Sequence, residues 1–317
     1  MRRTTTWLAL SALCWCALSL VVLAQNEKGK AKKRATPPKF GSEVSRIFFD
    51  DLFSRLQGER PEKPGAVVVT TAPTGGSPGA ASEGASYAWS KMISAVTIED
   101  EIKAIKLNVD KSVTTPSDFA GRGHKQVRRD FSILAAMFAI IGEFDDDVRW
   151  KKMGPAARDV FARTARNTKA GGNTNTYNEA KKRKADLQDL IGGASLQVEA
   201  EQADADWATV CDRGPLMQRL EVGFEGKMSA WISSKGEFEA NAENVLHEAE
   251  ITAVLSEILV KEGMDEWDDE DYVDLAKRMK EAAIEISSAV KLGNYDQARK
   301  ASGEVKKACT DCHEIYR

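Results

Sequence analysis

The end of the chain contains Gly293-Asn-Tyr-Asp-Gln-Ala298 and closes with Cys309-Thr-Asp-Cys-His-Glu-Ile-Tyr316-Arg317. Between these stretches, small and apolar side chains recur at the spacing of one helix face: Ala298, Ala301, Val305, Ala308 and Cys312. Gly293-Asn294 combines a residue that ends helices with one that caps the next helix. The sequence therefore predicts a last helix that starts after this pair and carries both cysteines and the histidine near its end.

Cys309-Thr-Asp-Cys312-His313 is a C-x-x-C-H motif, the signature of covalent haem attachment. On a helix the two thiols point the same way, so each can add to one haem vinyl group, and His313 then lies under the iron as proximal ligand. A structural zinc site needs further ligands, yet Cys211 stands alone in the body of the chain. A dithiol redox pair usually opens a helix rather than ending one. We predict one covalent haem c on Cys309 and Cys312.

Beyond about residue 87 the chain repeats itself at a constant offset of 118 residues. The matching landmarks include Trp89 with Trp207, Asp130 with Glu248, Ile133 with Ile251 and Tyr177 with Tyr295. Each copy has the periodicity of four amphipathic helices, and no strand pattern competes. We predict an all-α fold of two tandem four-helix bundles, over residues 88–200 and 201–317, that arose by internal duplication.

A four-helix bundle with C-x-x-C-H on its last helix resembles the cytochrome c′ family. The resemblance rests on the turn at residues 293–298 and on the ending at 309–317, where an aromatic residue and an arginine follow the histidine. It is strong over residues 236–317 and weaker in the first copy. The resemblance implies that Arg317 packs on the proximal side of the haem and that the first helix forms the opposite pocket. The resemblance also implies that the protein binds ligands or transfers electrons rather than catalysing a reaction.

The sixth coordination position of the iron leaves two interpretations open, because an open site favours gas binding and a methionine ligand favours electron transfer. Arg213-Gly-Pro-Leu-Met217 resembles the R-x-x-x-M pattern with which low-spin relatives of cytochrome c′ supply a distal methionine. However, Gly214-Pro215 is expected to break the helix that should carry this ligand. Met217 is therefore a candidate distal ligand, and an apolar wall made by Leu216 and Leu220 is the alternative.

The first copy lacks the attachment motif. Ile191, Ala194 and Ser195 occupy the positions of the two cysteines and the histidine. Leu187 and Leu190 stand where the second copy has smaller side chains, so they are expected to fill the space that a haem would take. We predict that this bundle holds no covalent haem.

The start of the chain has the form of a signal peptide. Arg2 and Arg3 precede an apolar run at residues 7–23, and Val22-Leu23-Ala24 resembles an A-x-A-like cleavage site. Because c-type cytochromes mature on the oxidising side of a bacterial membrane, export fits the motif. We expect residues 1–24 to be removed and the mature protein to be periplasmic, with an uncleaved signal as membrane tether being the alternative.

Residues 25–87 have the composition of a linker. A basic run at 28–34 leads to Pro37-Pro38, and a Gly- and Ser-rich stretch follows at 74–84. We expect this region to be mostly disordered, with one short amphipathic helix at about residues 44–56.

The composition of the 317 residues, 42% hydrophobic and 29% charged with a net charge of −3, is that of a globular protein. Nothing in it indicates a nucleic-acid partner. The acidic cluster at residues 265–274 is either a solvated surface or a docking face for a basic redox protein. We expect a redox protein or a diatomic gas as partner. The oligomeric state is left open, and a homodimer is one possibility.

The leading hypothesis is a periplasmic monohaem electron-transfer protein whose N-terminal bundle serves as a scaffold or docking module. The alternative is a five-coordinate haem that binds or traps nitric oxide or carbon monoxide. A haem peroxidase needs a distal acid and base pair, which is not found near Met217, so we predict no enzymatic activity.

Overall fold

The computed structural model describes residues 88–201 and 204–316. All of its regular elements are helical, and no strand occurs in these two ranges, which confirms an all-α fold. The predicted signal peptide and linker, and Arg317, lie outside the described residues. Among the helices described, none is both long and apolar enough to cross a membrane.

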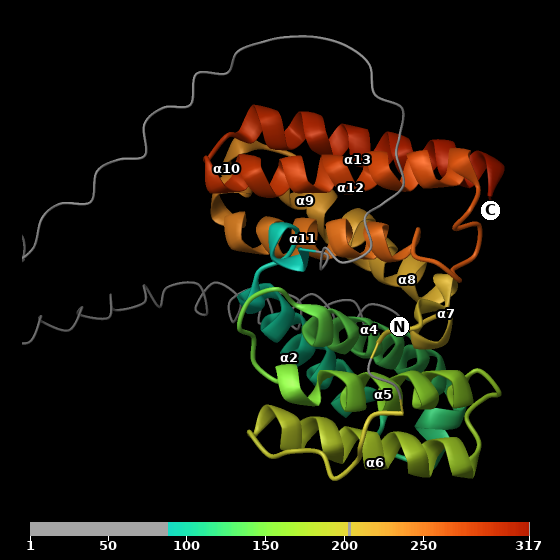
Figure 1. The fold of residues 1–317 in the computed structure, drawn as a ribbon. Helices are drawn as coiled ribbons and strands as arrows, with labels where there is room; N and C mark the ends of the chain where they lie inside the picture. The colour runs from blue at the N-terminus through green and yellow to red at the C-terminus, as the bar shows by residue number, and fades with distance from the viewer. Residues whose placement is uncertain (1–87, 202–203, 317) are drawn as a thin grey trace, which may run out of the picture. The chain divides into compact units, whose positions relative to one another are not determined.

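The N-terminal bundle comprises residues 88–201. Its main helices are α2 (Ala95–Ser112), α4 (His124–Glu143), α5 (Gly154–Thr168) and α6 (Thr174–Ile191), and its short elements are η3 (Trp89–Lys91), α3 (Pro116–Asp118), η4 (Phe119–Gly123) and η5 (Lys151–Met153). α4 packs against α2 and α5, and α6 packs against α5 and α2. The four long helices lie together in Figure 1.

The C-terminal bundle comprises residues 204–316. Its elements are α7 (Trp207–Val210), α8 (Arg213–Leu220), η6 (Glu221–Met228), α9 (Ser229–Trp231), α10 (Lys235–Ala240), α11 (Ala242–Ile258), α12 (Glu270–Lys291) and α13 (Tyr295–Ile315). α8, η6 and α9 follow one another without a gap and act as the first long helix. α11 packs against α12 and η6, and α12 packs against α13.

The junction between α12 and α13 has the structure that the sequence predicts. Gly293 has a φ of 65°, in the left-handed region that favours glycine. The side chain of Asn294 accepts a hydrogen bond from the backbone N–H of Gln297 at 3.1 Å, and so caps α13.

Two of the four pairs of helices start at matching positions. α2 and α8 start at Ala95 and Arg213, and α4 and α11 start at His124 and Ala242, so that both pairs are 118 residues apart. This agreement supports the repeat seen in the sequence, whose origin by duplication stays a prediction.

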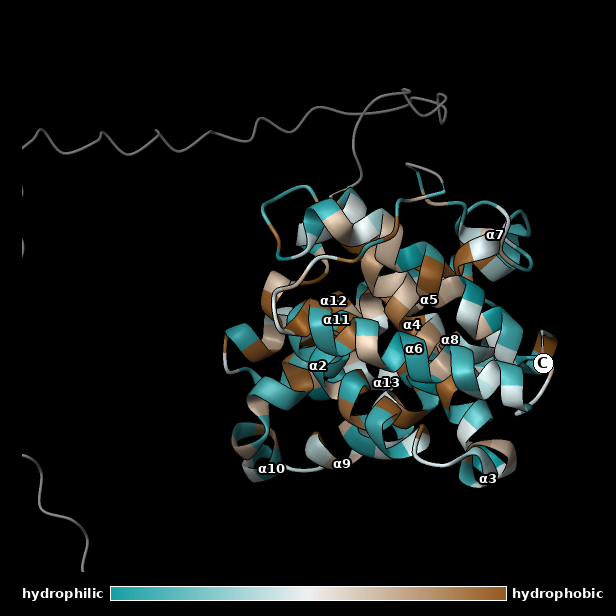
Figure 2. Ribbon diagram, turned by 90° about the horizontal axis from the view of Figure 1, so that it is seen from below, coloured by the Kyte–Doolittle hydropathy of each residue, from teal (hydrophilic) through white to brown (hydrophobic). Residues whose placement is uncertain are grey.

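α4 and α11 are the central helices of the described structure. Residues 133–141 of α4 and 248–258 of α11 are buried on every face. A helix segment that is buried on every face has to be covered from all sides by other elements. α4 packs not only on its own bundle but also on α8, and α11 packs also on α2. In Figure 2, hydrophobic colours are frequent on α4, whereas α6 is largely hydrophilic.

Asp130, in α4, is a buried acid with incomplete hydrogen bonding. Its side chain is 3% exposed, and Oδ1 accepts hydrogen bonds from Nε and Nη2 of Arg129 at 3.0 and 2.8 Å. Oδ2 is buried without a hydrogen-bond partner among the described residues. Burial raises the pKa of Asp130 to about 6, although Arg129 acts in the opposite direction.

We expect Asp130→Asn to raise the free energy of unfolding at pH 8 by about 3 kcal/mol, since the pKa lies about two units above its usual value and each pKa unit corresponds to about 1.4 kcal/mol. The native pKa exceeds that of the unfolded chain, so the charged carboxylate costs stability as pH rises from about 4 to about 6. Urea unfolding at pH 8 and at pH 4 measures this, with the exposed Asp100→Asn as control. An equal effect at both pH values would contradict the assignment.

Candidate haem-binding site

A cavity of about 340 Å³ lies between α8, η6, α11, α12 and α13. Cys309, Cys312 and His313 of α13 contribute to its lining. The first helix of the bundle contributes Met217 and Leu220 from α8 and Phe224 from η6. The structure thus brings the attachment motif and the candidate distal methionine together around one space.

The C-terminal end of α13 is held against α12. The hydroxyl of Tyr316 donates a hydrogen bond to Oδ1 of Asp269 at 2.7 Å. The rings of Tyr316 and Tyr272 meet edge to face with centroids 5.2 Å apart. Asp269 also caps α12, because its side chain accepts from the backbone N–H groups of Asp271 and Tyr272. These contacts fix the last turn, on which His313 lies exposed.

The two motif cysteines are half-buried free thiols. Burial, followed by the nearby Glu225 carboxylate, raises the pKa of Cys309 to about 11, and burial also raises the pKa of Cys312. Both thiols therefore stay protonated at neutral pH. The sulfur of Cys309 lies 3.5 Å from that of Met279. Cys211 is buried, with its pKa raised to about 12 by burial, as expected of an inert thiol.

The predicted break at Gly214-Pro215 is wrong. α8 starts at Arg213 and contains this pair in its first turn. Proline is tolerated there because the first N–H groups of a helix have no intrahelical partner. Met217 is consequently part of a regular helix, half-buried, and lines the cavity. Leu220 also lines it, whereas Leu216 is fully buried in the core, so only one of these two leucines belongs to the wall.

The wall continues into η6, which has π-helical winding over eight residues. Glu221, Phe224 and Glu225 of this segment line the cavity. Such winding is rare in proteins and is often found at functional sites. The corresponding stretch of the N-terminal bundle lies within α2 and is an ordinary α-helix. The two bundles therefore differ in the helix that faces the cavity.

The residues around this cavity fit a covalently attached haem. Two thiols and a histidine border it from one helix, as thioether attachment and axial ligation require. The remaining lining is largely apolar and includes Leu220, Phe224, Leu259, Leu275 and Ala308. A flat apolar macrocycle is stabilised by such walls.

The N-terminal bundle does not offer the same arrangement. α6 ends at Ile191, so Ala194 and Ser195 lie beyond the helix. Leu187 and Leu190 are fully buried, as the sequence predicts. The positions equivalent to the second cysteine and the histidine are thus not on a helical face.

Aromatic side chains fill the interior of the N-terminal bundle. Phe161 takes the position that is equivalent to Met279 in the cavity. Its ring stacks on Phe131 and Phe138, with centroids 5.6 and 5.5 Å apart. The larger ring occupies volume that a flexible methionine leaves available in the other bundle.

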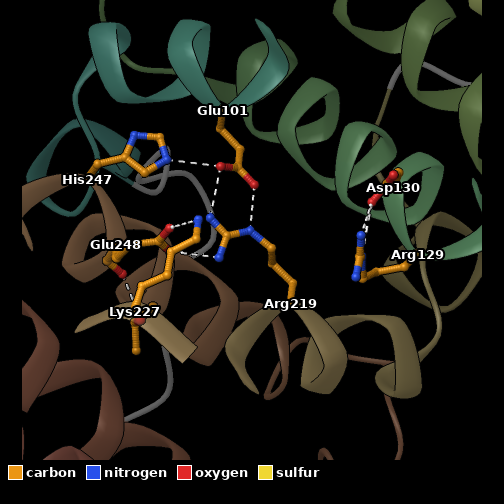
Figure 3. A network of polar contacts seen from close by, with 8 residues as sticks. Glu101, Arg129, Asp130, Arg219, Lys227, His247 and Glu248 are labelled. Atoms are coloured by element: carbon orange, nitrogen blue, oxygen red, sulfur yellow. Dashed lines mark hydrogen bonds and ion pairs between the residues drawn. The ribbon is translucent and has the colours of Figure 1, made fainter. Parts of the chain in front are cut away.

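An ion cluster that was not predicted from the sequence lies behind the wall of the cavity (Figure 3). Arg219 of α8 donates hydrogen bonds to Glu101 of α2 and to Glu248 of α11. The sequence does contain an indication of this cluster. Glu101 falls on the same helix face as the apolar residues Ile98, Ile102 and Ile105. A charge on such a face indicates a buried partner.

An all-helical bundle that presents C-x-x-C-H beside an apolar cavity has the fold and site of a c-type cytochrome. Residues 264–317 match the family model described as Cytochrome C'. The matched part includes the motif and the last two helices of the chain, and it is similar to the cytochrome c′ family. No curated protein and no solved structure compared with the chain matches it significantly.

Proposed function

We propose that this protein is a periplasmic monohaem cytochrome of the cytochrome c′ type that transfers electrons. The observation that carries the proposal is the convergence of Cys309, Cys312, His313 and Met217 on one apolar cavity. A bound haem would supply reversible one-electron chemistry at its iron.

Each of these side chains has a distinct task. Cys309 and Cys312 would hold a haem on α13 through thioether bonds, and His313 would bind its iron from the same helix. Met217, on the opposite helix, could supply a thioether ligand, which would raise the reduction potential and keep small ligands off the iron. The apolar walls exclude water from the haem face.

The N-terminal bundle is proposed to be haem-free and to act as a scaffold. The early end of α6 and the stacked ring of Phe161 support this assignment. Each chain then carries a single haem.

The charge of the C-terminal region supports a basic redox partner. Residues 201–317 contain 26 acidic and 14 basic side chains. Within the acidic cluster, Asp265 and Glu266 pair with Arg213 at 3.4 and 3.5 Å, and Trp267 remains 40% exposed. Acidic surface beside the cavity speeds association with a basic protein.

Gas binding is the second candidate, and the half-buried state of Met217 favours it. A side chain that is not locked by packing can leave the iron to a small ligand. Absorption spectra of the purified ferric and ferrous protein, with and without carbon monoxide, distinguish the two functions. A low-spin spectrum that carbon monoxide changes slowly supports electron transfer, and a high-spin spectrum with immediate binding supports the gas-binding function.

We expect His313→Ala to keep the covalent haem and to lose the proximal ligand. The thioether bonds depend on the cysteines alone, whereas the iron loses the imidazole that binds it. Haem staining should match that of the native chain, while the spin state and carbon monoxide affinity change. His124→Ala, in the N-terminal bundle, is the control. An unchanged spectrum in the His313 variant would count against the assignment.

A further inference from the structure

A buried ion cluster joins the two bundles. Arg219 donates from Nε and Nη2 to the two carboxylate oxygens of Glu101 at 2.7 and 2.9 Å, and from Nη1 to Glu248 at 2.7 Å. Nε2 of His247 lies 2.9 Å from Glu101. Glu101 belongs to the N-terminal bundle, whereas Arg219, His247 and Glu248 belong to the C-terminal bundle, as Figure 3 shows.

The members of this cluster depend on one another. Glu101, Arg219 and Glu248 are 2%, 8% and 3% exposed, so none of these charges is stabilised by bulk water. Burial by itself would raise the pKa of Glu101, but Arg219 and then His247 outweigh it and hold the pKa well below its usual range. The bidentate geometry fixes the guanidinium plane. Removing the charge of Glu101 therefore leaves Arg219 without its main restraint.

The cluster also contacts η6, the π-helical part of the wall. Lys227 of η6 donates to Oε1 of Glu248 at 2.9 Å. Gly223 of η6 lies so close to Arg219 and Glu248 that a Cβ at this position would collide with both. The neighbouring Phe224 lines the cavity. One side of η6 thus rests on the cluster while the other faces the site.

Glu101 and Arg219 occupy equivalent positions of the two bundles, because they are 118 residues apart in the sequence. The same is true of Trp89 and Trp207, whose ring centroids lie 5.8 Å apart. Equivalent residues meet in this way across a two-fold axis. In a dimer of identical bundles, a glutamate or an arginine at this position would face its own copy and repel it. The ion pair is available only because the two bundles differ in sequence.

We propose that Glu101 is a positioning residue through which the N-terminal bundle sets the wall of the haem cavity. It fixes Arg219, which with Glu248 and Lys227 holds η6 against the cavity. The inference rests on the proposed function, and it gives the haem-free bundle a task beyond that of a scaffold.

The test compares Glu101→Gln with Glu99→Gln in the full-length protein. Glu99 lies on the same helix but pairs at the surface, with Lys103 at 3.0 Å and Arg149 at 2.7 Å. In Glu101→Gln, amide hydrogen exchange over residues 221–228 should be about tenfold faster, since the restraint on a local opening is lost. The carbon monoxide affinity of the ferrous haem should change about fivefold, which is a typical size for the energetic coupling between two separate sites of a protein. Glu99→Gln should match the native protein in both.

Hydrogen exchange can be measured whether or not the chain carries a haem. A chain without covalent haem would contradict the proposed function, but the exchange test of Glu101 would still be valid. Glu101→Asp, which keeps the charge, should restore part of the protection. Should Glu101→Gln fail to fold, His247→Gln replaces it, because His247 is a partly exposed partner of the same carboxylate. Exchange over residues 221–228 equal to that of Glu99→Gln would overturn the proposal. Faster exchange with unchanged carbon monoxide affinity would overturn its link to the haem.

Discussion

Replacing both Cys309 and Cys312 by alanine is expected to abolish covalent haem attachment. Both thiols border the cavity, and the motif occurs once in the chain, so no other pair of cysteines can form the thioether bonds. Haem staining of a denaturing gel and the pyridine haemochrome assay should fall from one haem per chain to none. The N-terminal bundle, whose helices do not carry the motif, should stay folded by circular dichroism.

Cys211→Ala is the matched control. This thiol is buried away from the cavity, and its loss should leave the haem content at one per chain. Residual covalent haem in the double variant would contradict the attachment site. Two haems in the native chain would contradict the haem-free assignment of the N-terminal bundle.

The last helix and its start could be predicted from the sequence because they depend on local physics. The positive φ of Gly293 and the cap supplied by Asn294 are properties of these two residue types. The apolar spacing from Ala298 to Ala308 then places one face of α13 in the core. The position of the motif near the end of that helix follows from the same periodicity.

The shape of the opposite wall could not be predicted, because it depends on contacts between distant residues. The pair Gly214-Pro215 by itself indicates a break in the helix that carries Met217. The pair lies in the first turn of α8, however, where it is compatible with a regular helix. The π-helical winding of η6 coincides with a glycine, Gly223, that packs against Arg219 and Glu248. The partner that holds Arg219 in place is Glu101, which lies in the other bundle. No spacing rule within the haem-binding bundle points to it.

Met217→Ala is expected to turn a low-spin haem into a high-spin haem that binds carbon monoxide readily. The helical position of Met217 at the cavity removes the main objection to its role as distal ligand. Native protein should then show a methionine-to-iron charge-transfer band in the far red, and the variant should lack it. Carbon monoxide should bind at least about tenfold more tightly to the variant. In the native protein it has to displace the methionine from the iron, and a cost of only about 1.4 kcal/mol for this displacement weakens binding tenfold.

Leu220→Ala provides the control, since Leu220 lines the same wall and has no sulfur. This variant enlarges the cavity without removing a ligand, so it should keep the low-spin spectrum and the far-red band. A native protein that is already high-spin, with a spectrum that Met217→Ala leaves unchanged, would rule out ligation. Gas binding would then become the better supported function, because an iron with a vacant position needs no ligand displaced before a diatomic molecule enters.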